Sequence, residues 1–293
     1  MRFRATVENV SLFFRLIQSV EKLQKKCIIK FTEETMHIIC NHDANEGGIQ
    51  VWSQIKVDTI FTSYRIQSNA GNEITLALAS DALLAALRSC SAHESDDIIV
   101  KLAKKTEQAV LSFEISGLSR VGQRVRIAHD VRIDVLKPQD VERLQEPLCP
   151  EPDVHILFPP LQKLRTVVER MRIMSDVLAI KANGSSCLQL AINTDDVSVD
   201  TVWKNCINPK MPRAEAATQD ESAVERDPDH YYTVFVNIKS FLKFLHAHVV
   251  SSTTMACVCQ SHCLILYVYI GDVATTGGVL TFYIPAIFDD DDG

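Results

Sequence analysis

Long apolar runs, glycine-rich phosphate loops and a disulfide framework are all missing from this sequence. No stretch of about eighteen consecutive apolar residues occurs, so no membrane-spanning helix is predicted. The stretch from Met1 to Thr6 lacks the apolar region of a signal peptide. Gly47-Gly48 and Gly277-Gly278 lie between predicted strands, not before helices, which argues against a nucleotide-binding loop. The nine cysteines are scattered through regular segments, which indicates a reducing compartment.

A surplus of basic residues is also missing, since the formal net charge is −7. Two segments carry this acidity: Asp289 to Asp292 contribute −4, and Lys210 to Asp229 contribute −3. The rest of the chain is therefore neutral. A negative total does not exclude a nucleic-acid partner, because the distribution of charge matters more than its sum.

The second half of the chain resembles the first half, which predicts two copies of one unit. The matches at a shift of 148 positions are Leu16 with Leu164, Val20 with Val168, Glu21 with Glu169 and Lys22 with Arg170. Further matches join Val51-Trp52 with Val202-Trp203, which are the only two tryptophans, and Ala82–Leu87 with Ser240–Leu245 at a shift of 158. An additional polar loop in the second copy explains why the shift grows.

A proline-rich segment lies between the two copies. Pro147, Pro150 and Pro152 cannot sit inside a helix or a central strand, so the segment is expected to be a stiff, extended strap. The resulting division is a first domain over residues 1–136, a strap over 137–153, a second domain over 154–286 and an acidic tail over 287–293. Residues 205–229 are polar and proline-containing, and we expect them to form a disordered insertion.

Alternating and helical apolar patterns predict the same order of elements in both copies. In the first copy strands are expected over 2–7, 27–31, 36–40, 49–54, 60–67, 73–79, 98–103, 109–115 and 124–135, with one helix capped by Asn9 and another over 82–91. In the second copy strands are expected over 154–158, 177–182, 188–193, 197–203, 231–236, 254–259, 264–270 and 279–284, with helices from Pro159-Pro160 to about Met174 and over 238–248. Runs of strands with two helices per copy indicate an α+β fold, with antiparallel sheets and helices on one face.

This pattern resembles the DNA sliding-clamp fold of the proliferating-cell nuclear antigen family. Several segments resemble more closely the Hus subunits of the nine-one-one DNA-damage checkpoint clamp. These segments are Met1-Arg-Phe-Arg-Ala5, Ile127-Ala-His-Asp-Val131, Leu144-Gln-Glu-Pro-Leu-Cys-Pro-Glu-Pro-Asp-Val154, Val167-Val-Glu-Arg-Met171 and Phe282-Tyr-Ile-Pro-Ala286. The resemblance covers nearly the whole chain, and the strap with the helix after it is its most specific part.

The resemblance implies a non-enzymatic, nuclear protein without a cofactor. It implies that two other clamp-fold subunits complete a heterotrimeric ring around duplex DNA, which a clamp loader places at damaged sites or stalled forks. The ring would then recruit checkpoint and repair proteins. A homotrimeric replication clamp is the alternative, and residue patterns alone barely separate the two.

Basic residues recur on one side of the predicted helices, where they could meet phosphates without reading bases. The candidate DNA-facing residues are Arg15, Lys22, Lys26, Arg88, Lys163, Arg165, Arg170, Arg172, Lys239 and Lys243, with His246 beside them. The alternative is an ordinary solvated helix face, since every amphipathic helix needs a polar side.

Strand edges and the strap are the other candidate sites. The resemblance places the subunit contacts on Arg126, Val131 and Val135 in the first copy and on Val197, Val199 and Trp203 in the second. It also makes the strap a client-binding region, where Leu136, Leu144 and Leu148 are apolar residues in an otherwise polar segment. These leucines could equally pin the strap to the sheet.

A metal-dependent hydrolase is a weaker hypothesis. Cys257, Cys259, His262 and Cys263 lie close in sequence but lack the distant second ligand pair of a typical zinc site, so buried core cysteines are the better interpretation and no metal is expected. His129-Asp130 has no accompanying nucleophile motif, and we expect Asp130 to accept hydrogen bonds from backbone donors at a turn or strand edge.

Overall fold

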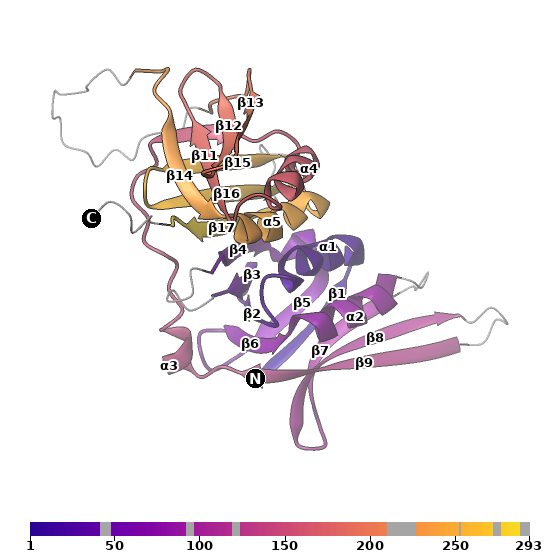
Figure 1. Cartoon of the computed structure of the whole chain (residues 1–293). Coiled ribbons are helices and arrows are strands. Elements are labelled where there is room, and N and C mark those ends of the chain that lie inside the picture. Colours follow the sequence, from indigo (N-terminus) through magenta and orange to yellow (C-terminus); the bar gives the residue numbers. More distant parts are fainter. Residues whose placement is uncertain are drawn as a thin grey trace.

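The computed structural model describes residues 1–41, 48–91, 97–118, 124–209, 227–251, 253–271 and 277–287 of the chain (Figure 1). The first half contains β1 (Arg2–Val7), α1 (Val10–Glu21), β2 (Lys26–Phe31), β3 (Thr35–Cys40), β4 (Gln50–Lys56), η2 (Val57–Thr59), β5 (Phe61–Gln67), β6 (Ile74–Ala79), α2 (Ser80–Ser91), β7 (Asp97–Lys105), β8 (Gln108–Leu118) and β9 (Arg124–Val135). The connection contains the short helix α3 (Pro138–Val141). The second half contains β10 (Val154–Leu157), α4 (Leu161–Met171), β11 (Val177–Ala182), β12 (Leu188–Asn193), β13 (Ser198–Trp203), β14 (Tyr232–Asn237), α5 (Ile238–Phe244), η3 (Leu245–Val249), β15 (Thr254–Cys259), β16 (Cys263–Ile270) and β17 (Gly278–Pro285).

The order strand, helix, strands, helix, three strands occurs twice, as the sequence predicts. Within the described residues, each strand of the first half has a counterpart in the second except β5, since β14 is the next described strand after β13. The described ends of the expected insertion are ordered: the Ile207 carbonyl accepts from the Leu157 amide (2.8 Å), and the Asn208 side chain donates to His155 O (2.8 Å). That part of the expectation is wrong, and the middle of the insertion lies outside the described residues.

The strand pairs of the described chain are antiparallel, and they form two sheets. One runs β10-β15-β16-β17-β4-β3-β2-β6-β9-β8-β7-β1-β5 and spans both halves, and the other runs β13-β12-β11-β14. The α+β architecture with antiparallel sheets is thus confirmed. Figure 1 shows helices α1, α2, α4 and α5 gathered on one side of the strands.

One apolar core runs beneath the helices of both halves. Leu16 and Val20 on α1 and Leu164 and Val168 on α4 are fully buried, as expected for one apolar stripe per helix. The Asn9 side chain accepts from the Leu12 amide (3.0 Å), so the expected cap of α1 is confirmed.

The two tryptophans do not occupy equivalent places. Trp52 packs against the outer-face cluster that contains Cys257 and Tyr283, whereas Trp203 packs against the main core. The counterpart of Val51 is instead Val199. Both side chains point to the core, and the next residue in each strand, Trp52 or Asp200, points outward. The apparent tryptophan match is therefore wrong, and the shift of 148 positions between Leu16 and Leu164 still holds at β4 and β13.

The two halves are joined by the pairing of β4 with β17, from Gly278 opposite Ile55 to Tyr283 opposite Gln50. A glycine is needed where this ladder begins. A Cβ on Gly278 would lie 2.5 Å from the Gln54 carbonyl oxygen and 2.7 Å from Ile55 Cα. Because both atoms belong to the backbone, the collision could only be relieved by moving β17 away from β4.

We expect Gly278→Ala to lower the free energy of unfolding by about 1–3 kcal/mol, the range of a strained backbone position. The matched control is Gly71→Ala, because Gly71 has φ +61 but no atom within 4 Å of its Cβ position. It should cost less than Gly278→Ala, since it adds strain without a collision. Urea denaturation of both variants measures the difference, and equal losses would contradict a close approach at β17.

Candidate nucleic-acid and subunit interfaces

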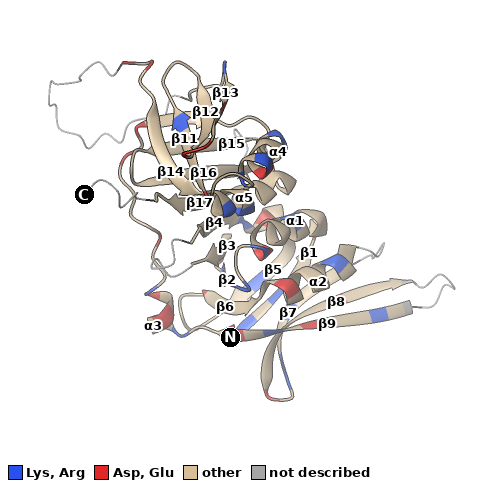
Figure 2. Ribbon diagram, in the orientation of Figure 1, with Lys and Arg blue, Asp and Glu red and all other residues tan. Residues whose placement is uncertain are grey.

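The helices form one continuous layer across both halves of the chain. Helix α1 contacts α2 on one side and η3 of the other half on the opposite side, and η3 also contacts α4 and α5. Figure 2 shows Lys and Arg on α2, α4 and α5. The polar side of this layer faces away from the core, so its charges are available to a partner.

The layer brings together most of the cations that the sequence singled out. Arg15, Lys22, Arg88, Lys163, Arg170, Arg172, Lys239 and Lys243 are exposed on or beside the helices, and Arg165 is half-buried. Lys26 is an exception, because it begins β2 and its Nζ lies 3.8 Å from Asp134 Oδ2 on β9. Its assignment to the first helix is wrong. Lys25, exposed between α1 and β2, was missed although it stands beside Lys26 in the sequence.

Local carboxylates neutralise only some of these cations. Arg165 pairs with Glu169 (2.7 Å) and Lys239 pairs with Asp176 (2.8 Å). Arg88 lies over the Phe14 ring, 5.9 Å from its centroid. Lys22, Lys163, Arg170, Arg172 and Lys243 have no ion-pair partner within the described ranges. The layer therefore keeps an unneutralised positive charge drawn from both halves.

His246 shows how closely the cations of the two halves approach each other. Its pKa is lowered, first by burial and then by the charges of Arg165, Lys22 and His248. Arg165 Nη1 lies 3.5 Å from His246 Nδ1. Lys22 belongs to the first half and Arg165 to the second, so the positive face is continuous across the junction, while His246 itself stays neutral near pH 7.

Two long strands keep one free edge each. In the described chain β13 pairs with β12 alone, and β9 pairs with β8 along most of its length. The last residues of β9 are different: Val135 lies opposite Leu76 and Ile133 opposite Leu78, on β6. Val135 is therefore not at a free edge, contrary to its expected role, whereas Arg126 and Val131 lie along the free part.

Along β13, backbone groups that bond to β12 alternate with groups that point to the free edge. The Thr194 amide donates to the Val197 carbonyl (2.9 Å) at the turn before β13. Because bonded and non-bonded pairs alternate in an antiparallel ladder, Ile192 and Val199 form a bonded pair, and Asp200 turns its N–H and C=O to the free edge. Val199 thus uses its donor inside its own sheet, and Asp200 offers one to a neighbour.

Polar groups and a thiol hold the strap to the outer face of the sheet, and Leu148 takes no part in this contact. Tyr283 donates its hydroxyl to Glu146 Oε1 (2.6 Å), and Cys149 packs against the cluster around Cys257 and Tyr283. Asp153 Oδ2 accepts from the Gln260 amide (2.8 Å). Leu148, in contrast, is 103% exposed. The pinning hypothesis therefore does not apply to Leu148.

Leu144 and Leu136 lie in less exposed parts of the strap region. Leu144 is half-buried and its amide donates to the Val141 carbonyl (3.0 Å), which closes the turn after α3. Leu136 lines a cavity of about 630 Å³ that Ile74 and Val135 also line.

The Cys candidates lie in the sheet core, and His129 Nε2 lies 2.7 Å from Ser89 Oγ, whereas Asp130 binds Lys105. Cys257, Cys259 and Cys263 are buried, and burial raises the pKa of Cys257 to about 12. No group of three potential ligands has metal-binding geometry in the described part of the chain. Asp130 pairs with Lys105 (2.6 Å), a contact that its expected role as a backbone acceptor did not include.

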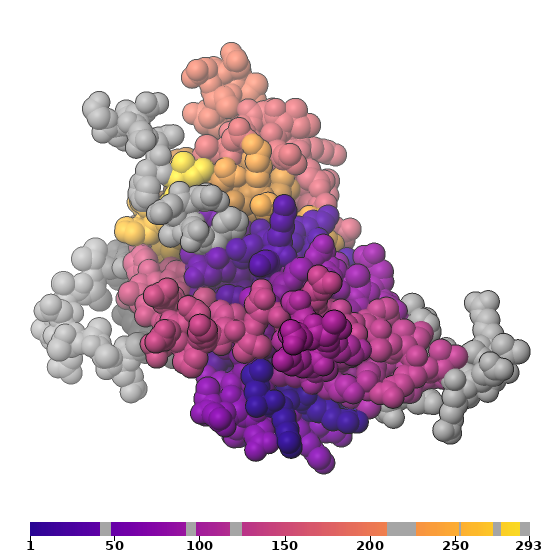
Figure 3. All heavy atoms as spheres, turned by 90° about the horizontal axis from the view of Figure 1, so that it is seen from below, coloured from indigo at the N-terminus to yellow at the C-terminus, as the bar shows by residue number. Residues whose placement is uncertain are grey.

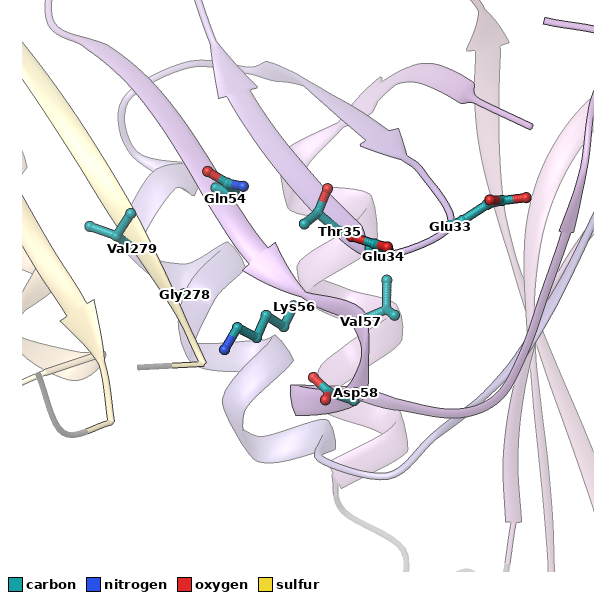
Figure 4. Close-up of a pocket in the computed structure, with 9 residues that line it drawn as sticks. All are labelled: Glu33, Glu34, Thr35, Gln54, Lys56, Val57, Asp58, Gly278 and Val279. Atoms are coloured by element: carbon teal, nitrogen blue, oxygen red, sulfur yellow. The ribbon is translucent and has the colours of Figure 1, made fainter. Parts of the chain in front are cut away.

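A cavity of about 550 Å³ lies where β4 meets the start of β17. Figure 4 shows Lys56 reaching from β4 toward Gly278, with Asp58 near it and Glu33 and Glu34 on the far wall. Charges of both signs share this small space, and we assign it no ligand. Within the described ranges, no helix combines the length and apolarity needed to span a bilayer.

Comparison with known proteins identifies the relatives of the chain. The model of the Hus1-like protein family matches residues 1–288. The checkpoint protein hus1 of Schizosaccharomyces pombe is 34% identical, over 99% of this chain and 100% of that protein. The checkpoint protein HUS1 of Homo sapiens is 30% identical, over 98% and 100% of the two chains. The crystal structure of the proliferating cellular nuclear antigen from Entamoeba histolytica superposes with a TM-score of 0.71 at 14% identity, covering 98% of this chain and 99% of that one.

Proposed function

The chain belongs to the Hus1-like protein family, and we propose that it closes a ring with two other clamp-fold chains and encircles duplex DNA. As a member of this family it is a subunit of the 9-1-1 checkpoint clamp and not an enzyme. The proposal extends to a nuclear location, a clamp loader that opens the ring, and checkpoint and repair proteins as clients. Residues 1–136 and 154–286 would be its two clamp domains, with 137–153 as the strap.

The observation that carries the ring is the pairing of β4 with β17 inside the chain. Lys56 N donates to Gly277 O (2.9 Å), which puts Trp52 in a bonded pair with Thr281 by the alternation of the ladder. Asp200 holds the place in β13 that Trp52 holds in β4. The counterparts of β4 and β17 are β13 and β9, and in the described chain each of these two strands has a free edge. Neighbouring chains would repeat at these edges the contact that already joins the two halves.

The helix layer supports the DNA contact. Its unpaired cations lie on the side opposite to the outer sheet face, and lysine and arginine can follow phosphates without reading a base sequence. One chain supplies only part of a ring, so the isolated subunit should hold DNA weakly. In the assembled ring the layers of three chains converge on one duplex.

The first prediction concerns the edge of β13. Asp200→Pro removes a donor that faces the free edge, so it should abolish binding of one clamp partner while changing the stability of the isolated chain by less than about 1 kcal/mol. Val199→Pro removes a bond inside the sheet and should cost the chain at least about 1 kcal/mol. Co-purification with both partners and thermal unfolding measure the two effects.

The control for charge is Asp200→Asn, which keeps the backbone donor and should retain both partners. A complete trimer that assembles from Asp200→Pro with unchanged affinity would show that β13 is not a ring contact.

The second prediction concerns the helix layer. Changing Lys22, Arg170 and Lys243 together to Glu should weaken retention of the ring on DNA of any sequence. The loss of about three phosphate contacts should flatten the slope of log affinity against log salt by about 2.7 units. The matched control changes Lys104, Lys137 and Arg143 to Glu, which alters the net charge equally on β7 and the strap. If the ring with the three helix substitutions assembles normally and keeps its salt slope, the helix layer does not face the DNA.

The third prediction concerns the strap. Leu148→Ser removes a fully exposed apolar side chain, so it should not lower stability, but it should weaken a client peptide that covers Leu148 by roughly tenfold. Ile207→Ser is the control, because Ile207 is also an exposed aliphatic residue, at 63%, and lies outside the strap. Fluorescence anisotropy with labelled client peptides gives the affinities. Equal binding of every client to Leu148→Ser and to the unchanged chain would remove this residue from the client site.

A further inference from the structure

A row of positive side chains crosses the outer face of the first-half sheet, on the side away from the helices. Arg65 on β5 lies directly opposite Arg4 on β1, and Arg4 lies directly opposite Lys101 on β7. Like charges placed directly opposite each other in a sheet destabilise it. The fold therefore keeps an arrangement that works against its own stability, which suggests a use for it.

Carboxylates neutralise the positive charge at only one end of the row. Glu114 accepts from Lys101 (2.8 Å) and from Arg126 (2.6 Å), and these contacts lower the pKa of Glu114. Arg4 and Arg65 have no ion-pair partner in the described part of the chain, and neither has Arg2, two residues from Arg4 on the same face. Three exposed guanidinium groups therefore remain without a counter-charge.

These arginines line a cavity of about 570 Å³. Its walls are Arg2, Phe3, Arg4, Arg65, Ile66, Gln67 and Asn72. The Asn72 side-chain amide donates to Glu33 Oε1 (2.7 Å), and none of the described residues that line the cavity is acidic. In the view from below, the indigo atoms of the N-terminal segment stand at the surface between purple neighbours (Figure 3). The site is thus both hollow and accessible.

Strand β5 adds a second feature to this site. It is the last strand of its sheet and, within the described ranges, pairs with β1 alone. A free strand edge can accept an extended peptide through main-chain hydrogen bonds, while the flanking side chains choose the peptide. A guanidinium group binds a carboxylate or a phosphate through two parallel hydrogen bonds.

We infer that Arg65, on the edge strand β5, and Arg2 and Arg4, on the neighbouring strand β1, bind an extended anionic peptide of a partner protein. Its phosphorylated or acidic side chains enter the cavity between β1 and β5. The charges around the site favour a peptide over a nucleic-acid strand. Glu8 lies at one end of the β1–β5 pair, where it accepts from Thr62, and Glu114 lies beyond Lys101. A long phosphate backbone would be repelled at Glu8, although not at Glu114, whose charge Lys101 and Arg126 compensate, whereas a short peptide needs only the arginines.

The test uses the full-length chain and Arg65→Glu, which places a carboxylate opposite Arg4. Because a like-charge pair becomes an opposite-charge pair, the thermal midpoint should rise, although binding should fall. We expect a short fluorescent peptide that carries phosphoserines to bind the unchanged chain, and Arg65→Glu to weaken it by about tenfold or more, the loss expected for one charge-assisted contact. A site used only for folding would not give a stability gain together with a binding loss.

Three further arms make the result decisive. Arg143→Glu makes the same charge change on the strap and should leave peptide binding intact, and Arg65→Gln shows whether removal of the charge is sufficient. A version of the peptide with Glu in place of phosphoserine separates acidity from phosphorylation, and binding of either version supports the site. Failure of both versions to bind, or equal loss in Arg143→Glu, would overturn the proposal. Tighter binding of a single-stranded oligonucleotide that Arg65→Glu also abolishes would overturn it in favour of a nucleic acid.

Discussion

The pairing of β4 with β17 is the contact on which the rest of the architecture depends. It converts two separate sets of strands into one sheet that spans both halves, and it lets α1 of the first half pack against η3 of the second. The helix layer and its continuous positive face exist only because this ladder fixes the relative position of the halves. The ladder in turn requires Gly278, where no side chain fits between the two backbones.

The same ladder accounts for the free edges. A repeated unit that joins its own copy through the edge of β4 and the edge of β17 must leave the corresponding edges, β13 and β9, unpaired at its two ends. Exposed edges invite pairing with other chains, and natural proteins normally cover or blunt them. A closed ring would pair the edges of β13 and β9 without an additional element. The repeat and the ring are thus two consequences of one type of contact.

Side-chain periodicity predicted much of this fold, and its failures have a common cause. The strands β11, β12 and β15 begin and end where the apolar alternation placed them, and Asn9 caps α1 as expected. Periodicity reports which face a side chain occupies, but it does not report which partner a backbone amide bonds to. The sequence therefore does not reveal that Asp200, and not Val199, turns its backbone donor to the free edge.

Periodicity also fails to predict contacts between residues that lie far apart in the sequence. Two tryptophans suggested a match that the opposite facing of Trp52 and Trp203 removes. The hydrogen bond from Tyr283 to Glu146 joins residues that are far apart in the chain and bear no mutual pattern. Contacts of this kind follow from the register of strands, which a single sequence does not display.

The distribution of charge shows why net charge is a poor guide to the partners of this chain. The total is −7, yet the helix layer and the arginine row on the opposite face are both positive. The two surfaces differ in what surrounds them. The helix cations are spread along one continuous face, which suits the regular phosphates of a duplex, whereas Arg2, Arg4 and Arg65 crowd around one cavity between carboxylates. Positive charges distributed along a surface favour a ligand that can slide, whereas positive charges grouped at one cavity favour a ligand bound at a fixed position. One chain can therefore hold a polymer on one face and a specific partner on the other.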